Sequence, residues 1–205
     1  MSKVDFKKEW KYLYQPSKKD FQVVDVPEMK FFKVDGQGTP GVVPEYMAAI
    51  EALYAMSYKT KFISKNLGKD YVVPPLEGLW WADDMATFTT ARDKSQWRWT
   101  MMIMTPEWIT EEIFQNAREE TVSKKDLPGL DLLRWEPYQE GLCAQILHLG
   151  SYDDEGPVLA RLHQEWMLEN GYTFNGLHHE IYLSDPRRVE PQKLKTILRQ
   201  PIRQV

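Results

Sequence analysis

The chain has 205 residues, a net charge of −4 and one cysteine, Cys143. This length suits one large domain or two small ones and is sufficient to bury a core. The acidic balance provides no broad cationic surface, so nucleic acid is excluded as a main partner. The longest apolar runs are too short for a membrane span, and the N-terminus has no signal-peptide core. We therefore expect a cytoplasmic, globular protein with no membrane partner.

The N-terminal arm carries four aromatic side chains among lysines. This pattern predicts a short amphipathic helix that packs on the domain, and a partner-binding arm is the alternative. Two runs rich in β-forming residues follow, 21–26 and 29–34, and the Pro27-Glu28 pair between them indicates a hairpin. Apolar residues at helical spacing then predict a helix over 44–63.

The same order of elements returns in the C-terminal half. Runs 133–138 and 142–149 again predict strand, turn and strand, and a helix is expected from about residue 157. Gly36 and Gly150 close the two strand pairs 114 positions apart, and this offset also superimposes the two helices. We therefore predict a duplicated domain.

Each predicted module ends in a strand that leads to a proline. These strands are 97–104, before Pro106, and 178–184, before Pro186. The prolines are 80 positions apart rather than 114, a difference of 34. The first module is therefore expected to carry an insertion of that size at about 64–98.

The predicted fold is α+β, with two β-β-α-β modules in a single domain over residues 1–205. The N-terminal arm, the first module with its insertion, a connecting helix with a linker, and the second module are expected at 1–19, 20–105, 106–129 and 130–205. The connecting helix is predicted to be capped by Thr105, with Pro106 as its first residue. Beyond Pro186 we expect a short helix over 192–198 as a solvated terminal cap.

The last predicted strand has a carboxylate, Glu180, at its centre. Strand alternation places two sets of side chains on opposite faces: Leu177, His179, Ile181 and Leu183 on one, and His178, Glu180, Tyr182 and Ser184 on the other. The first set is typical of a core. The second set indicates a site, because burying an ionised Glu without a partner is costly. The alternative is a sheet face open to water, where a Glu is simply solvated.

Aromatic residues make up 13% of the chain, and the adjacent pair Trp80-Trp81 lies in the predicted insertion. Because adjacent strand residues point to opposite faces, at least one of these rings is expected to face a cavity. No phosphate-binding loop, metal-binding motif or nucleophilic serine motif occurs, and the adjacent His178 and His179 diverge. We therefore predict neither a metal nor a cofactor. His163 lies on an apolar helix face and is interpreted as a core histidine.

The stretches 24–27 and 31–38, the helix that follows, and the closing Glu-Ile-Tyr-Leu-Ser-Asp-Pro at 180–186 resemble the GyrI-like small-molecule-binding domain. The resemblance covers nearly the whole chain, about residues 5–202. It implies two side-by-side modules of the SHS2 type, with helices on one face and an aromatic ligand cleft on the other. In drug-sensing members, a buried Glu on the last strand receives flat cationic drugs inside a cage of rings, and Glu180 matches its position.

The arm and the Leu79-Trp80-Trp81 segment resemble the free-standing branch of this family, which lacks a DNA-binding part. Some members of that branch hydrolyse flat, cyclopropane-bearing DNA-alkylating compounds. The resemblance therefore implies a detoxifying hydrolase that acts on a flat aromatic small molecule, with Glu180 as the base that accepts a proton from water. The implied catalytic residues are Glu180 and Tyr182. The implied ligand-binding residues are Trp80, Trp81, Trp99, Trp135, Tyr138, His178 and Glu180.

Two other classes of function use the same features. A binding protein that sequesters or senses aromatic or cationic drugs would use Glu180 as a counter-charge and the rings for cation–π contacts. An interaction protein would use exposed Trp80 and Trp81 to bind another chain, with a homodimer as one such assembly. Turnover of a substrate separates the enzyme from the binder.

Overall fold

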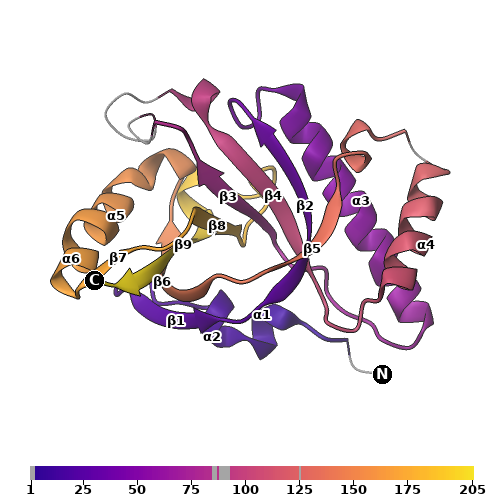
Figure 1. Cartoon of the computed structure of the whole chain (residues 1–205), viewed down its shortest axis with the longest axis horizontal. Coiled ribbons are helices and arrows are strands. Elements are labelled where there is room, and N and C mark those ends of the chain that lie inside the picture. The colour runs from indigo at the N-terminus through magenta and orange to yellow at the C-terminus, as the bar shows by residue number, and fades with distance from the viewer. Residues whose placement is uncertain (1–2, 85–86, 88–92, 125) are drawn as a thin grey trace.

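The computed structural model describes residues 3–84, 87, 93–124 and 126–205. Within these ranges the chain forms one antiparallel sheet of nine strands with helices packed on it, which confirms the predicted α+β class (Figure 1). Residues 85–86 and 88–92 of the predicted insertion and Lys125 of the predicted linker lie outside this description. No described helix has the length and apolar character needed to cross a membrane.

The strands are β1 (Gln22–Val26), β2 (Met29–Gln37), β3 (Leu76–Trp81), β4 (Arg98–Thr105), β5 (Arg134–Tyr138), β6 (Gly141–Leu149), β7 (Tyr172–Phe174), β8 (His178–Tyr182) and β9 (Lys195–Gln204). The helices are α1 (Phe6–Glu9), α2 (Lys11–Tyr14), α3 (Pro44–Asn66), α4 (Glu111–Val122), α5 (Gly156–Ala160) and α6 (Met167–Glu169). A π-helical segment, Arg161–Trp166, joins α5 to α6. Strands β1, β2, β4, β5 and β6 and helix α3 agree closely with the predicted segments, whereas β3 lies in the predicted insertion.

The sheet order is β1-β6-β9-β8-β3-β4-β2-β5, with β7 attached to β9. Two three-stranded halves, β6-β9-β8 and β3-β4-β2, meet where β8 pairs with β3. The outer strands are exchanged, since β1 pairs with β6 and β5 pairs with β2. The predicted hairpins are therefore wrong. Neither Pro27-Glu28 nor Gln139-Glu140 provides the Asn-Gly type of sequence that closes a two-residue hairpin, and the chain crosses to the other half instead.

The C-terminal segment is a central strand, so the predicted terminal helix over 192–198 is wrong. Only Pro191–Lys193 forms a helical turn, of the 3-10 type, and β9 then runs between β6 and β8. Its alternation is hidden in the sequence because polar side chains are buried on both faces. Arg199 and Gln200 are 1% and 2% exposed.

The position of β9 also corrects the predicted repeat. By the symmetry of the sheet, β9 corresponds to β4, and β8 corresponds to β3. Each half therefore has the order β-β-α-β-β, and β8 is its penultimate long strand rather than its last. The segment 64–98 was predicted to be an insertion with no counterpart in the second module. This prediction is wrong, because the segment contains β3, which corresponds to β8.

The helices cover both faces of the sheet. Helix α3 packs on β2 and β4, while the α5–α6 segment packs on β6 and β9 on the same face. The short helices α1 and α2 pack against the opposite face and confirm the predicted docking of the arm. Helix α4 packs on α3, and it begins at Glu111 rather than at Pro106. Its cap is Thr110, whose hydroxyl accepts a hydrogen bond from the Ile113 amide, whereas Thr105 is the last residue of β4.

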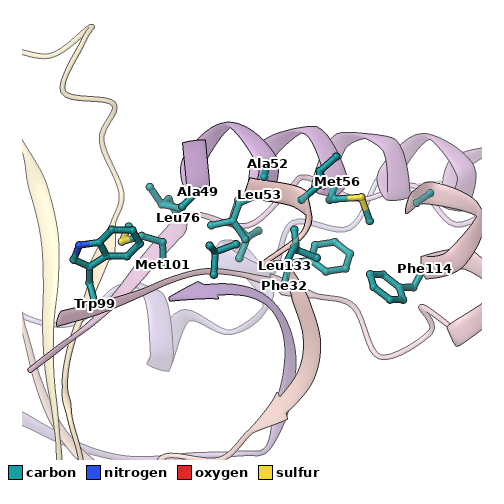
Figure 2. Packing of buried hydrophobic residues seen from close by; sticks show 14 of the residues in the cluster. Phe32, Ala49, Ala52, Leu53, Met56, Leu76, Trp99, Met101, Phe114 and Leu133 are labelled. Carbon is teal, nitrogen blue, oxygen red and sulfur yellow. The ribbon is translucent and has the colours of Figure 1, made fainter. Parts of the chain in front are cut away.

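The core beneath α3 is built from small helix residues facing large strand residues. Ala49 and Ala52 are fully buried and bring the helix close to the sheet, where Phe32 and Trp99 fill the space (Figure 2). Trp99 lies over Gly36 of the neighbouring strand, and a Cβ atom at Gly36 would overlap the Trp99 ring. Position 36 therefore requires glycine for packing rather than for backbone conformation.

Gly36→Ala is expected to lower the free energy of unfolding by about 1–3 kcal/mol, because the added methyl group displaces the Trp99 ring from a filled core. Gly156→Ala is the matched control, since a Cβ atom there meets nothing within 4 Å. Urea denaturation of both variants measures the difference. Equal stability of the two variants would contradict this description of the core.

Candidate functional site

A cavity of about 1230 Å³ lies between α3 and α5, over strands β3 and β8. It exists because each helix covers only the strands of its own half, which leaves the two central strands open between the helices. The cavity is therefore on the face that carries α3 and α5. The expectation of helices on one face and the cleft on the other is wrong, since α1 and α2 cover the opposite face.

The pairing of β3 with β8 fixes the side chains on the cavity floor. Gly78 lies opposite Glu180, and Trp80 lies opposite His178. Residues directly opposite each other point to the same face, and the predicted alternation is confirmed within β8, where His178, Glu180 and Tyr182 line the cavity. It is wrong for Leu177 and Leu183, which lie just outside the strand and line the cavity as well. The lack of a side chain at Gly78 makes room for Trp80 and Tyr182. A Cβ atom at this position would lie 2.9 Å from Trp80 Nε1 and 3.0 Å from Tyr182 Oη.

A chain of hydrogen bonds ends at Glu180. Trp80 Nε1 donates to Tyr182 Oη at 3.1 Å, and Tyr182 Oη donates to Glu180 Oε2 at 2.8 Å. His178 Nε2 lies 3.4 Å from the other carboxylate oxygen, Oε1. Burial, followed by the charge of Glu180, raises the pKa of Tyr182 well above its ordinary value. The phenol therefore stays protonated and holds the Glu180 carboxylate in position.

A second carboxyl group, Glu155, completes the floor. Glu155 is only 4% exposed, and it lines the same cavity. Burial, followed by the charge of Glu180 and a hydrogen bond with it, raises the pKa of Glu155 to about 10. Two carboxyl groups that share a buried site cannot both ionise, so Glu155 keeps its proton at neutral pH. Nothing in the sequence separates Glu155 from the solvated acidic run that precedes α5.

Four aromatic side chains from three segments surround these carboxyl groups. They are Tyr46 and Tyr54 on α3, Trp97 before β4 and Tyr152 before α5. The Tyr152 ring meets the Tyr182 ring edge-on with centroids 5.6 Å apart, and Trp97 meets Trp80 in the same way at 6.0 Å. Such walls provide stacking surfaces for a flat ligand. None of these four residues was among the predicted site residues, because helical spacing and loop positions do not show that they face the cavity.

Five of the predicted site residues line the cavity. They are Trp80, Trp81, His178, Glu180 and Tyr182. His163 lines it as well, so its interpretation as a core histidine is wrong. Among the described residues, no group of three His, Cys, Asp or Glu side chains is arranged to hold a metal ion.

The other three predicted ligand-binding residues, Trp99, Trp135 and Tyr138, lie away from the cavity. Trp99 is 0% exposed in the core beneath α3. Trp135 and Tyr138 belong to β5, which strand exchange places at the far edge of the sheet on β2. There the Trp135 Nε1 donates to Thr105 Oγ1 at 2.9 Å.

Behind the cavity floor, on the opposite face, lies a buried ionic network. His179 lies between two carboxylates, with Nδ1 2.8 Å from Glu140 Oε1 and Nε2 2.9 Å from Glu77 Oε2. Arg199 donates to Glu140 Oε2 at 3.1 Å and to the Leu13 carbonyl of α2 at 2.9 Å. The network therefore connects β3, β8, β9 and the N-terminal arm.

The charges in this network stabilise each other. Burial alone would lower the pKa of His179, but the carboxylates of Glu140 and Glu77 raise it to about 9. Burial would likewise raise the pKa of Glu140, but His179 and Arg199 lower it to about 2. At neutral pH the network holds two cations and two anions, and each ion has a partner.

A profile of the GyrI-like small-molecule-binding domain matches residues 19–203, and the chain belongs to this family. An uncharacterized conserved protein from Listeria innocua is 38% identical, with a TM-score of 0.89 over 98% of this chain and 100% of that chain. A hydrolase from Listeria innocua is also 38% identical, with a TM-score of 0.87 and the same coverage. The C-terminal domain of EcmrR, at 11% identity, has a TM-score of 0.56 over 91% of this chain and 98% of its own, which shows the fold alone. A comparison with curated proteins finds no match.

Glu155→Gln is expected to change how stability depends on pH. The folded carboxyl keeps its proton up to about pH 10, whereas the unfolded one releases it near 4.5, so its contribution to stability is greatest at low pH and falls as pH rises. The free energy of unfolding of the wild type should therefore fall relative to that of the variant by on the order of 1 kcal/mol per pH unit between about pH 5 and pH 8. Urea denaturation across this range measures it.

Glu169→Gln, which changes an exposed carboxylate on α6, is the control and should differ from the wild type by an amount that does not vary with pH. A constant difference between the wild type and Glu155→Gln would show that Glu155 is ionised in the folded protein.

Proposed function

We propose that the protein is a hydrolase that adds water to a flat aromatic electrophile bound between α3 and α5. The observation that supports this most directly is the pair of carboxyl groups on the cavity floor. Glu155 keeps a proton, while Glu180 accepts a hydrogen bond from Tyr182. Environments that separate the protonation of two neighbouring carboxyl groups are typical of an acid and a base. The 38% identity to a Listeria innocua hydrolase supports the same reaction class.

The proposed substrates are flat, polycyclic DNA-alkylating compounds that carry an activated cyclopropane fused to a dienone. The cavity of about 1230 Å³ exceeds the usual range for drug-sized ligands, roughly 300–1,000 Å³, and so suits several fused rings. The aromatic side chains of both halves would stack on the planes of the substrate and place the strained ring near Glu180.

In the proposed reaction, Glu180 accepts a proton from a water molecule as the water oxygen attacks the cyclopropane carbon. A carbon–oxygen bond forms, the strained carbon–carbon bond breaks, and its electron pair moves to the dienone oxygen to give a phenolate. Tyr182 holds Glu180 in orientation through their 2.8 Å hydrogen bond. Ring strain in the substrate provides part of the driving force.

Glu155 is the proposed source of the proton that the phenolate oxygen takes up. Glu180 leaves the reaction protonated and Glu155 leaves it ionised, and the hydrogen bond between the two carboxyl groups allows the proton to return to Glu155. The pair then has its starting protonation, and the substrate has gained one water molecule.

A non-catalytic binder of cationic aromatic drugs is the second candidate. The carboxylate of Glu180 among the rings of Trp80, Tyr152 and Tyr182 would attract a delocalised cation through charge and cation–π contacts. The two candidates use the same cavity and differ in whether the ligand leaves it changed.

Glu180→Gln is expected to reduce turnover of a cyclopropanoid alkylator by about a hundredfold or more, because the amide cannot accept the proton from water. The product, recognised by mass spectrometry as the substrate plus one water, should form in multiple turnovers with the wild type. The variant should still bind dibenzofuran, a neutral flat probe, within about twofold of the wild type, since that probe makes no charged contact.

Glu169→Gln, at an exposed position on α6, should retain full turnover and is the matched control. If the wild type returns the alkylator unchanged from a tight complex, the hydrolase is excluded in favour of the binder. If Glu180→Gln retains turnover, Glu180 is not the base.

A further inference from the structure

The cavity wall carries two histidines that take no part in the proposed proton transfers. His163 lies on the π-helical segment Arg161–Trp166, and His178 is the first residue of β8. Both line the cavity. π-Helical turns within α-helices are rare and are frequently found at functional sites. The π-helical segment between α5 and α6 therefore points to a functional role for this part of the cavity wall.

The two imidazoles stand edge to face beside a phenyl ring. The ring centroids of His163 and His178 are 6.5 Å apart with an angle of 84° between their planes. The ring of Phe174 lies 5.0 Å from that of His163. Polar ring edges and an apolar surface thus meet at one place in the cavity wall.

The nitrogens of these rings are not satisfied by the protein. Within the part of the chain that the structure describes, His163 Nε2 and His178 Nδ1 are buried without a hydrogen-bond partner, and His178 Nε2 has only its 3.4 Å approach to Glu180 Oε1. A buried polar group that lacks a partner costs about 1–3 kcal/mol. Two such atoms in one part of the cavity wall indicate a group that binds there and completes their hydrogen bonds.

His163 offers hydrogen bonds without charge. Burial, followed by the charge of His178, lowers the pKa of His163 to about 4, so its imidazole is neutral at pH 7. A neutral imidazole has one N–H donor and one nitrogen acceptor. Such a pair is complementary to a carbonyl oxygen or an N–H group and provides no counter-charge for an anion.

We propose that His163 and His178 form a second recognition subsite of the cavity, which binds the carbonyl or N–H edge of a neutral, flat aromatic ligand. The subsite rests on the proposed function because it serves the same cavity, but it acts in binding and orientation rather than in proton transfer. Phe174 contacts the plane of the ligand, and the histidines determine which edge of that plane lies against this part of the cavity wall, beside Glu180.

Two neutral three-ring probes test the subsite. Acridone carries one carbonyl and one N–H, whereas dibenzofuran has neither. Isothermal titration calorimetry is expected to show that the wild type binds acridone about tenfold more tightly than dibenzofuran, the effect of one or two hydrogen bonds. His163→Phe should lose this preference while its affinity for dibenzofuran stays within about twofold, and His163→Gln should keep most of it.

Glu165→Gln, an exposed position on the same π-helical segment, is the control and should leave both affinities unchanged. Because His163→Phe could fold poorly, the imidazole nitrogen NMR signals of the wild type are the second measurement, and they should shift with acridone but not with dibenzofuran. Equal affinity for the two probes, no binding of acridone, or unchanged imidazole signals would overturn the subsite. None of these results alters the turnover test at Glu180, so failure of the subsite and failure of the proposed hydrolysis are distinguishable.

Discussion

The centre of the sheet depends on the buried imidazolium of His179, which is held between the carboxylates of Glu77 and Glu140. Removing one ion from such a network leaves its partner buried and unpaired, a large penalty. Because alternate strand residues point to opposite faces, the pairing that satisfies His179 also directs its neighbour Glu180 into the cavity. A slip of β8 by one residue would bury Glu180 behind the sheet and expose the network to the cavity. The ionic core thus determines the orientation of the site on the other face.

Much of the fold could be predicted from local patterns, and the remainder depended on contacts between distant residues. The β-rich runs and the long apolar helix were predicted from the sequence, because their residues follow the periods of strands and helices. Strand β9 was not, because Arg199 is buried by partners from β6 and α2 that no local pattern reveals. The exchange of β1 and β5 was equally hidden, since strand register is set by the partner strand and not by the strand itself.

The candidate site divides in the same way. Glu180, Tyr182 and Trp80 could be predicted from strand alternation and the family resemblance, because their own strands direct them to the cavity. Trp99 and Trp135 have the same ring chemistry as Trp80, and only the order of strands in the sheet separates core rings from cavity rings. Glu155 lies in a run of acidic residues that is typical of a solvent-exposed loop. Its burial beside Glu180 arises only when the two halves of the sheet come together.

The exchanged outer strands have a consequence for how a ligand reaches the cavity. Each half of the sheet contributes its first strand to the edge of the other half, with five residue pairs in each contact. The halves are thereby joined at both edges as well as along β3 and β8. A hinge motion that separated the two halves would break the hydrogen bonds of the β1–β6, β2–β5 and β3–β8 pairs. Entry and exit of a ligand must therefore rely on side chains and connecting segments at the cavity mouth, over a floor that stays fixed.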